Sequence, residues 1–183
     1  MVRGKSNHTN YLTESQVEKL FKALKDDRNG HRNYTWALMA YRHGLRAAEA
    51  CGLQWSDIDL ERGRIHVRRV KDGVESVHPL QGDEIRALRQ VKREQETPSK
   101  FVFISEQRSA ITTSMMGKAI RAAGKRADLP PVHPHMLRHS CGYALANAGH
   151  DTRRLQHWLG HASIQNTVRY TALNENAFKD FWR

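Results

Sequence analysis

The sequence predicts an α+β fold that is mainly helical and carries one small antiparallel sheet. Apolar residues recur at helical spacing through most of the 183 residues. Two segments differ, because residues 65–70 and 74–80 alternate apolar and polar side chains on either side of a Lys71-Asp72-Gly73 turn. That arrangement is typical of a β-hairpin. The length suits one domain with a sizeable core and is short for two.

The residues before the hairpin predict three helices. Thr13 and Gln16 form a capping box that begins the first helix. A second helix is expected over residues 34–43, ended by Gly44, and a short third helix over residues 46–52. The apolar face of the first helix is formed by Val17, Leu20, Phe21 and Leu24.

The residues after the hairpin return to helical spacing. Residues 82–96 predict one helix, and residues 101–105 form a short apolar run, FVFIS, that is either a strand or a buried segment. From Thr112 onward the sequence predicts helices separated by short turns at Gly or Pro, with Pro134 in the first turn of one of them.

The charge balance favours a polyanionic partner. Lys and Arg number 30 against 19 Asp and Glu, which gives a net charge of +11 and an isoelectric point of about 10.1. Each phosphate that a basic protein neutralises releases counterions and strengthens binding at low salt. A basic protein with a merely solvated surface is the alternative that charge alone leaves open.

The cysteines and the lack of long apolar segments predict a cytoplasmic protein. Cys51 and Cys141 lie far apart without CxxC spacing, so we expect small buried side chains in a reducing compartment. Residues 1–15 lack the apolar run of a signal peptide, and no stretch approaches the roughly 18 apolar residues of a transmembrane span. The cytoplasm is also the compartment that holds bacterial DNA.

Residues 133–140, HPHMLRHS, gather groups that bind phosphate. Pro134 places His135 and Arg138 three residues apart on one face near a helix start. The free amide groups there already favour anions, and a guanidinium can hold two phosphate oxygens. The alternative is that His135 caps the helix while Arg138 forms a surface salt bridge.

The same segment also raises the question of a metal site. His133, His135 and His139 follow an HxHxxxH pattern. No Asp, Glu or Cys joins them at ligand spacing, and Pro134 restricts how the rings can converge. We therefore predict no metal and no cofactor.

Three further residues supply the remaining chemistry. Tyr170, nine residues after His161, is either a core residue or a nucleophile that needs nearby cations and a proton acceptor. Arg46 would complete a two-arginine clamp with Arg138. Lys71, on the predicted turn, is either a solvated lysine or a general acid for a departing 5′ oxygen. Together these groups indicate metal-free exchange of DNA strands through a phosphotyrosine.

The order and spacing of these residues resemble the tyrosine recombinase (phage integrase) family. The matching motifs are GLRAAE, LRHS, QHWLGHASI and VRYT, and the resemblance extends from about Thr13 to Trp182. The blocks AYRHGLR, IHVRRVKDG, VHPL and HPHMLRHSCGYALA are most similar to the short invertases that switch fimbrial promoters. The resemblance implies a site-specific recombinase that cleaves and rejoins DNA through a 3′-phosphotyrosyl bond and inverts a promoter segment.

The resemblance also implies a role for each site residue. Lys71 would protonate the leaving 5′-hydroxyl, and Tyr170 would form the covalent bond. Glu49 matches an acidic residue of the first arginine motif and would orient Arg46. Exchanging one phosphate ester for another preserves bond energy, so neither ATP nor a metal is required. The residues implied to hold and activate the scissile phosphate are Arg46, His135, Arg138 and His161.

Two other interpretations stay open at the level of sequence. The same chemistry serves integration, excision, or relaxation in the manner of a type IB topoisomerase. The second interpretation is a DNA-binding regulator that kept the fold and lost the catalytic activity. Every catalytic position holds the expected residue type, which argues against the regulator.

The resemblance sets expectations for organisation and partners. Larger relatives carry a separate N-terminal DNA-binding domain, whereas here we expect a flexible basic arm over residues 1–12 and one catalytic domain over residues 13–183. We expect double-stranded DNA as the partner, a homo-oligomer (a tetramer) on that DNA, and DNA-bending accessory proteins.

Two sets of residues are candidates for these contacts. The C-terminal residues form an apolar stripe that packs either on its own core or on a neighbouring subunit. A basic helix before residue 133 is either a DNA contact or a solvated face. The stripe contains Ala177, Phe178, Phe181 and Trp182. The basic residues of the helix are Arg121, Lys125 and Arg126.

Overall fold

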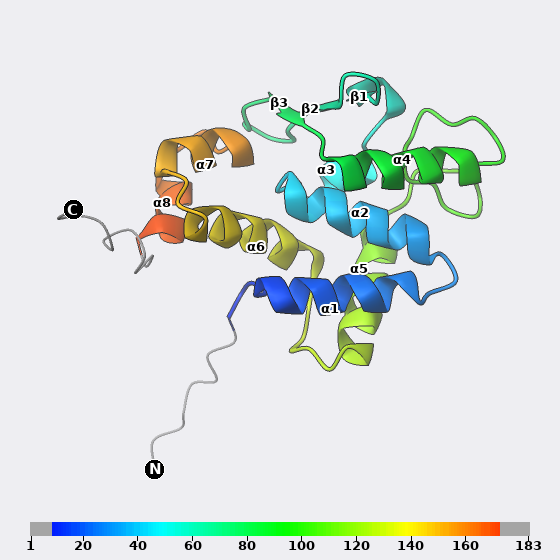
Figure 1. Cartoon of the computed structure of the whole chain (residues 1–183), viewed down its shortest axis with the longest axis horizontal. Helices are drawn as coiled ribbons and strands as arrows, with labels where there is room; N and C mark the ends of the chain where they lie inside the picture. The colour runs from blue at the N-terminus through cyan, green and yellow to red at the C-terminus, as the bar shows by residue number, and fades with distance from the viewer. Residues whose placement is uncertain (1–8, 173–183) are drawn as a thin grey trace, which may run out of the picture.

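The computed structural model describes residues 9–172 as a mainly helical fold with a small antiparallel sheet (Figure 1). The predicted fold class is confirmed. The helices are α1 (Glu14–Lys25), α2 (Gly30–Arg42), α3 (Ala47–Cys51), α4 (Gly82–Glu94), α5 (Thr113–Arg126), α6 (Pro134–Asn147), α7 (Thr152–Leu159) and α8 (Gln165–Thr171). A short 3-10 helix, η1 (Trp55–Asp57), leads into the strands β1 (Ile58–Asp59), β2 (Arg64–Val67) and β3 (Ser76–Pro79).

Helix α2 is the centre of the larger core. It packs against α1, α4 and α6, and Figure 1 shows α4 and α1 on its opposite sides. Trp36 and Met39 of this helix are completely buried, and burial of each such side chain contributes about 1.5–3 kcal/mol. The predicted capping box begins α1, because Thr13 Oγ1 accepts the main-chain N–H of Gln16 at 3.3 Å. The central helix therefore fixes the elements on which the site is built.

The sheet has the strand order β1-β2-β3, and both pairs are antiparallel. Ile65 and Val67 of β2 point into the core, and Val67 pairs with Ser76 of β3. The predicted tight turn is wrong, because the connection between β2 and β3 is a longer loop over residues 68–75. Arg69 turns inward and is only 8% exposed, so the chain leaves the strand ladder before it reaches Lys71. Strand β1 was not predicted.

Helices α6, α7 and α8 enclose a second, smaller core at one end of the molecule (Figure 1). Gly160 ends α7 in the left-handed conformation with φ 65°. Gly142 allows the ring of Tyr170 to lie directly on α6, since a Cβ at this position would stand 2.7 Å from the ring. The buried residues of this small core are Cys141, Ala146, Leu155, Leu159 and Tyr170.

One local prediction needs correction, and three are confirmed. Helix α2 begins at Gly30 rather than near residue 34, and its N-cap Asn29 makes no side-chain capping hydrogen bond. Of the two alternatives for residues 101–105, the structure shows the buried segment, with isolated bridges and with Phe103 fully buried. Pro134 is in the first turn of α6, as expected. The two cysteines are free and buried, also as expected.

The ends of the described region meet the small core. Tyr11 stacks on Tyr143 of α6 with ring centroids 4.0 Å apart. Leu12 is 3% exposed and donates its N–H to Ser140 Oγ at 2.8 Å. The end of the predicted arm thus packs on the domain, while the apolar stripe over residues 177–182 lies outside the described residues. No helix within residues 9–172 is long and apolar enough to cross a membrane.

Replacing Gly142 with Ala tests the close approach of α6 and α8. The added Cβ must displace the ring of Tyr170, and we expect a loss of roughly 1–3 kcal/mol in the free energy of unfolding, as for other overpacked cores. Denaturant titration measures it. Gly82→Ala, on the exposed first turn of α4, is the matched control, because its Cβ meets only the tip of Arg86. Equal stability of the two variants would refute the contact.

Candidate active site

Glu49 anchors the first arginine of the site. Its side chain is 1% exposed, and Oε1 accepts a hydrogen bond from Arg46 Nη1 at 2.8 Å. The other oxygen, Oε2, accepts the main-chain N–H of Arg46 at 2.9 Å, which places Arg46 at the N-cap of α3. Burial raises the pKa of Glu49, but the hydrogen bonds from Arg46 and the charge of Arg69 outweigh burial and hold the pKa below its ordinary value.

Arg69, which no sequence motif singled out, is the buried counterpart of Glu49. Its side chain is 0% exposed, and Nη1 donates to Glu49 Oε2 at 2.9 Å and to the carbonyl of Gly44 at 3.2 Å. Nη2 donates to the carbonyls of His43 at 3.3 Å and Trp158 at 2.6 Å. Burial lowers the pKa of Arg69, and the Glu49 carboxylate opposes that shift. Arg69 therefore joins the end of α2 to α3 and α7.

Arg138 lies against the same main-chain segment. The residue is 2% exposed, and its guanidinium donates from Nη1 to the carbonyl of Gly44 and from Nη2 to the carbonyl of Leu159 at 2.8 Å. Burial lowers the pKa of Arg138 to about 10, so the side chain stays charged at neutral pH. These contacts exclude the alternative of a surface salt bridge. The second arginine is therefore held beside the first by the turn at Gly44.

His135 lies on the first turn of α6, three residues before Arg138. His133, and not His135, occupies the N-cap, and it makes no side-chain capping bond. The ring of His135 meets that of His139 edge-on, with centroids 4.6 Å apart. Partial burial and then the charge of Arg138 lower the pKa of His135. The structure thus places His135 next to Arg138, as its spacing predicted.

The hydroxyl of Tyr170 meets a histidine, His139, that the sequence raised only as a candidate metal ligand. Tyr170 is 3% exposed, and its Oη lies 2.9 Å from Nδ1 of His139. Burial raises the pKa of Tyr170, and the charges of Arg169 and Arg138 partly offset that rise. Burial lowers the pKa of His139 to about 4. At neutral pH the protonated phenol therefore donates to an uncharged imidazole.

His161 lies beside Tyr170, a contact that the sequence could not establish. The two rings are nearly parallel, at 8°, with centroids 6.4 Å apart. Nδ1 of His161 lies 2.8 Å from Oγ1 of Thr167, which fixes the ring. Burial, followed by the charges of Arg138 and Arg46, lowers the pKa of His161 to about 4. His161 therefore shares one electrostatic environment with both arginines.

Lys71 stands on the β2–β3 loop, between β2 and β3. It is exposed and adopts a left-handed backbone with φ 56°. The loop lies against the turn that precedes His161, because the N–H of Val74 donates to the carbonyl of Gly160 at 3.2 Å. The structure thereby brings the loop of Lys71 to the same edge as His161, although the two residues are far apart in sequence.

The basic residues of α5 divide into two kinds. Arg121 and Lys125 are exposed. Arg126 donates to the carbonyl of Ala23 at 2.9 Å and forms an ion pair with Asp27 at 3.0 Å. Arg126 thus ties α5 to α1, whereas the first two residues present their charges to solvent.

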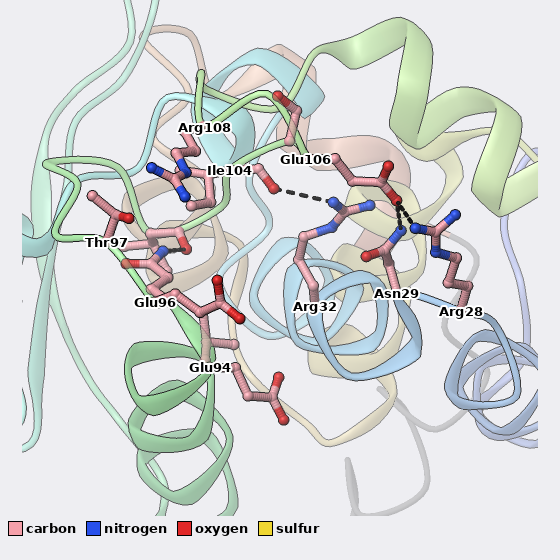
Figure 2. A pocket seen from close by; sticks show the side chains of 13 residues that line it. Arg28, Asn29, Arg32, Glu94, Glu96, Thr97, Ile104, Glu106 and Arg108 are labelled. Carbon is pink, nitrogen blue, oxygen red and sulfur yellow. Dashed lines mark hydrogen bonds and ion pairs between the residues drawn. The ribbon is translucent and has the colours of Figure 1, made fainter.

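A polar cavity of about 510 Å³ lies apart from this cluster, between the α1–α2 turn, the end of α4 and residues 102–108 (Figure 2). Its charges pair within the cavity, for example Arg28 with Glu106 at 3.4 Å, and Arg32 donates to the carbonyl of Ile104 at 3.0 Å. None of the predicted site residues lines it. Within residues 9–172 there is no group of three or more His, Cys, Asp or Glu side chains that could hold a metal ion.

Comparison with known protein sequences gives consistent matches over nearly the whole chain. A sequence model of the phage integrase family matches residues 10–177. The chain is 42% identical over 178 residues to two proteins of Escherichia coli K12, the type 1 fimbriae regulatory proteins FimE and FimB. Each match covers 94% of this chain, and 90% and 89% of the two relatives. Tyrosine recombinase XerA of Pyrococcus furiosus is 30% identical over 92% of this chain and 59% of its own length.

Solved structures match in the same way. The crystal structure of XerA recombinase superposes with a TM-score of 0.79 at 31% identity, over 94% of this chain and 63% of that one. XerH recombinase in a post-cleavage complex with its difH substrate gives a TM-score of 0.80 at 24% identity, over 93% of this chain and 52% of that one. At 24% identity, the match to XerH shows that the two proteins share a fold.

The buried histidines predict that the fold weakens in mild acid. The pKa values of His139 and His161 fall from an ordinary 6.5 to about 4, so the unfolded chain binds more protons between these values. The stability they contribute is complete above pH 6.5 and is lost as the pH falls toward 4. Melting temperatures measured from about pH 7.5 to about pH 4.5 should fall with acidity. His161→Gln should flatten that dependence; an unchanged slope would contradict the assignment.

Proposed function

Because the chain belongs to the phage integrase family of tyrosine-type site-specific recombinases, we propose that it cleaves and rejoins double-stranded DNA through a 3′-phosphotyrosyl bond to Tyr170. One observation carries this proposal. A phenol, three histidines and two arginines, from α6, α8, the start of α3 and the turn after α7, are held around the turn at Gly44 and the turn at Gly160. These are the groups that transfer of a phosphate ester to a tyrosine requires.

Arg46 and Arg138 bind the scissile phosphate in this proposal. Each guanidinium is already fixed by protein contacts, through Glu49 and through the carbonyls of Gly44 and Leu159. A preorganised cation does not have to be reoriented when negative charge builds up on the phosphate oxygens. His135 and His161 are uncharged hydrogen-bond donors to the same oxygens.

Tyr170 is the proposed nucleophile. Its oxygen attacks phosphorus and forms the phosphotyrosyl bond, while the bond to the 5′ oxygen breaks. Lys71 gives the departing 5′ oxygen a proton, as a general acid does. His139 holds the phenol through the 2.9 Å hydrogen bond and takes up its proton as the attack proceeds. The exchange needs neither ATP nor a metal, since one ester replaces another.

We propose inversion of a promoter segment as the biological outcome. The relatives FimE and FimB are named as regulators of type 1 fimbriae, and the match to each covers about nine-tenths of its length. Switching a promoter by inversion is a form of regulation that strand cleavage and rejoining can accomplish. Integration, excision and relaxation of supercoiled DNA use the same chemistry and are the outcomes that experiment must separate.

The proposed partners follow from the charge and from the chemistry. Strand exchange joins two duplexes and cuts four strands, so a tetramer on DNA supplies one tyrosine for each strand. DNA-bending accessory proteins would bring the two sites together. Arg121 and Lys125 of α5 would contact the DNA backbone, as would Arg126, in addition to the pair that Arg126 forms with Asp27.

Tyr170→Phe tests the nucleophile. The experiment incubates a nicked suicide duplex that carries the recombination site with wild type or variant in EDTA. We expect a covalent protein–DNA adduct that survives denaturation with wild type, and none with the variant, because phenylalanine has no oxygen to attack phosphorus. Gel shifts under native conditions check that both proteins bind the duplex. An adduct with the variant would show that another residue is the nucleophile.

Arg46→Ala and Arg138→Ala separate catalysis from binding. We expect the rate of adduct formation to fall by about 10²–10³, with DNA affinity almost unchanged, because one cation among many phosphate contacts adds little affinity. Arg93→Ala, on the exposed end of α4, is the control. Thermal melts show whether Arg138→Ala still folds. Equal losses in cleavage and in affinity would contradict the proposed roles.

The outcome of recombination is tested with two plasmids. One carries two copies of the site in inverted orientation, and the other carries none. We expect inversion of the segment on the first plasmid and no relaxation of the second, because a site-specific enzyme cleaves only where protomers assemble on its site. Efficient relaxation of the plasmid without sites would instead favour a topoisomerase activity.

A further inference from the structure

A second histidine cluster lies behind the site and takes no part in the proposed chemistry. Glu84 Oε1 of α4 is 2.7 Å from Nε2 of His43, at the end of α2. Nδ1 of His43 is 3.0 Å from Nδ1 of His78 on β3. Nε2 of His78 is 2.8 Å from Oγ of Ser76, the first residue of β3. Glu84, His43 and His78 are buried at 1–2% exposure.

These hydrogen bonds form one continuous series. The Glu84 carboxylate also accepts the N–H of Gln81 at 2.8 Å. His43 hydrogen-bonds through Nε2 to Glu84 and through Nδ1 to His78. Nε2 of His78 completes the series with the hydroxyl of Ser76. Burial, together with the charges of His43 and Arg69, lowers the pKa of His78 to about 3, which keeps this ring neutral.

This series of hydrogen bonds joins β3 to the elements that hold the arginines. The ring of His78 stacks on Trp158 of α7, with centroids 3.7 Å apart and an interplanar angle of 14°. The carbonyls of Trp158 and His43 both accept hydrogen bonds from Arg69. Trp158 Nε1 also donates to the carbonyl of Arg42 at 3.0 Å. Because His78 is part of β3, the strand that ends the loop of Lys71, these contacts fix that strand against α7 and the end of α2.

The loop of Lys71 is held at its two ends, and between them the N–H groups of Val70 and Val74 donate to Glu49 and to the carbonyl of Gly160. At one end Arg69 is buried in the network with Glu49. At the other end Ser76 pairs with Val67 and closes the histidine chain. Lys71 itself is exposed in a left-handed conformation that non-glycine residues rarely adopt. Such a conformation persists only where the surroundings hold the chain in place.

We infer that His43 and His78 are positioning residues, which seat β3 so that Lys71 reaches the departing 5′ oxygen. This inference rests on the proposed role of Lys71 as the general acid. It adds to that role a specific support, the continuous series of hydrogen bonds from Glu84 to Ser76. Neither histidine is among the groups proposed to contact DNA, and both ring nitrogens of each are occupied by protein partners.

The chemistry of the leaving group provides the test. Suicide duplexes are made with the ordinary scissile phosphodiester or with sulfur in place of the bridging 5′ oxygen. A thiolate leaves without a proton, since thiols are far more acidic than alcohols, so the sulfur substrate needs no general acid. Adduct formation is measured for wild type, His78→Phe, His43→Gln and Lys71→Ala.

We expect His78→Phe and His43→Gln to cleave the ordinary duplex about 10–100-fold more slowly than wild type, because a catalytic group displaced by about 1 Å loses up to 10²-fold. On the sulfur substrate both should recover to nearly the wild-type rate, as should Lys71→Ala. Arg138→Ala should stay slow on both, because its defect lies in binding the phosphate. His157→Phe, an exposed histidine beside Trp158, is the matched control and should behave like wild type.

Each other result has a distinct meaning. If Lys71→Ala recovers on sulfur and the histidine variants do not, the histidines do not act through Lys71 and the inference fails. If Lys71→Ala does not recover, the proposed role of Lys71 is wrong and the inference fails with it. Wild-type rates for His78→Phe on the ordinary duplex would also overturn the inference. Melting curves show whether each variant still folds, His78→Phe above all. Ser76→Ala removes the last hydrogen bond of the series without changing a ring, and it should show the same rescue on the sulfur substrate in milder form.

Discussion

The buried pair of Arg69 and Glu49 is the interaction on which the rest of the site depends. Both side chains are essentially inaccessible, and their charged atoms are 2.9 Å apart. Burial of two charges costs several kcal/mol per ion in a protein interior, and removal of one partner typically costs about 3–5 kcal/mol. Here further hydrogen bonds offset the cost, because Arg69 also binds three main-chain carbonyls and Glu49 also binds Arg46. The main effect of the Arg69–Glu49 pair is therefore to fix the positions of Arg46, α3 and α7 relative to one another, rather than to raise the overall stability of the fold.

The seam between the two cores is consequently polar. Each core is apolar within itself, but the end of α2 meets α7 through guanidinium–carbonyl contacts of Arg69 and Arg138. Hydrogen bonds have direction, whereas apolar contacts can slide. The directed bonds fix the end of α2 against α7 closely, at the place where the candidate site lies. The candidate site lies on this seam.

The sequence predicted those features that local patterns encode. Helices α1, α4 and α6 follow from apolar spacing, a capping box and Pro134, and the order of Arg46, Arg138 and Tyr170 follows from their motifs. It failed where a polar residue is buried. Arg69 and His139 carry no local sign of burial, since an isolated charge or imidazole is usually solvated. The turn at Lys71 was predicted too tight for the same reason, because Arg69 leaves the strand ladder to meet partners that lie far away in sequence.

Tyr170 meets two demands at once. Its ring fills the small core against Gly142 and Tyr143, and its hydroxyl ends on His139. The packing of α8 on α6 and the position of the proposed nucleophile are therefore set by the same contacts. A substitution that loosens this small core would also misplace the hydroxyl that the proposed reaction uses. The apolar residues of the small core are in this sense as much a part of the proposed site as the side chains that would contact phosphate.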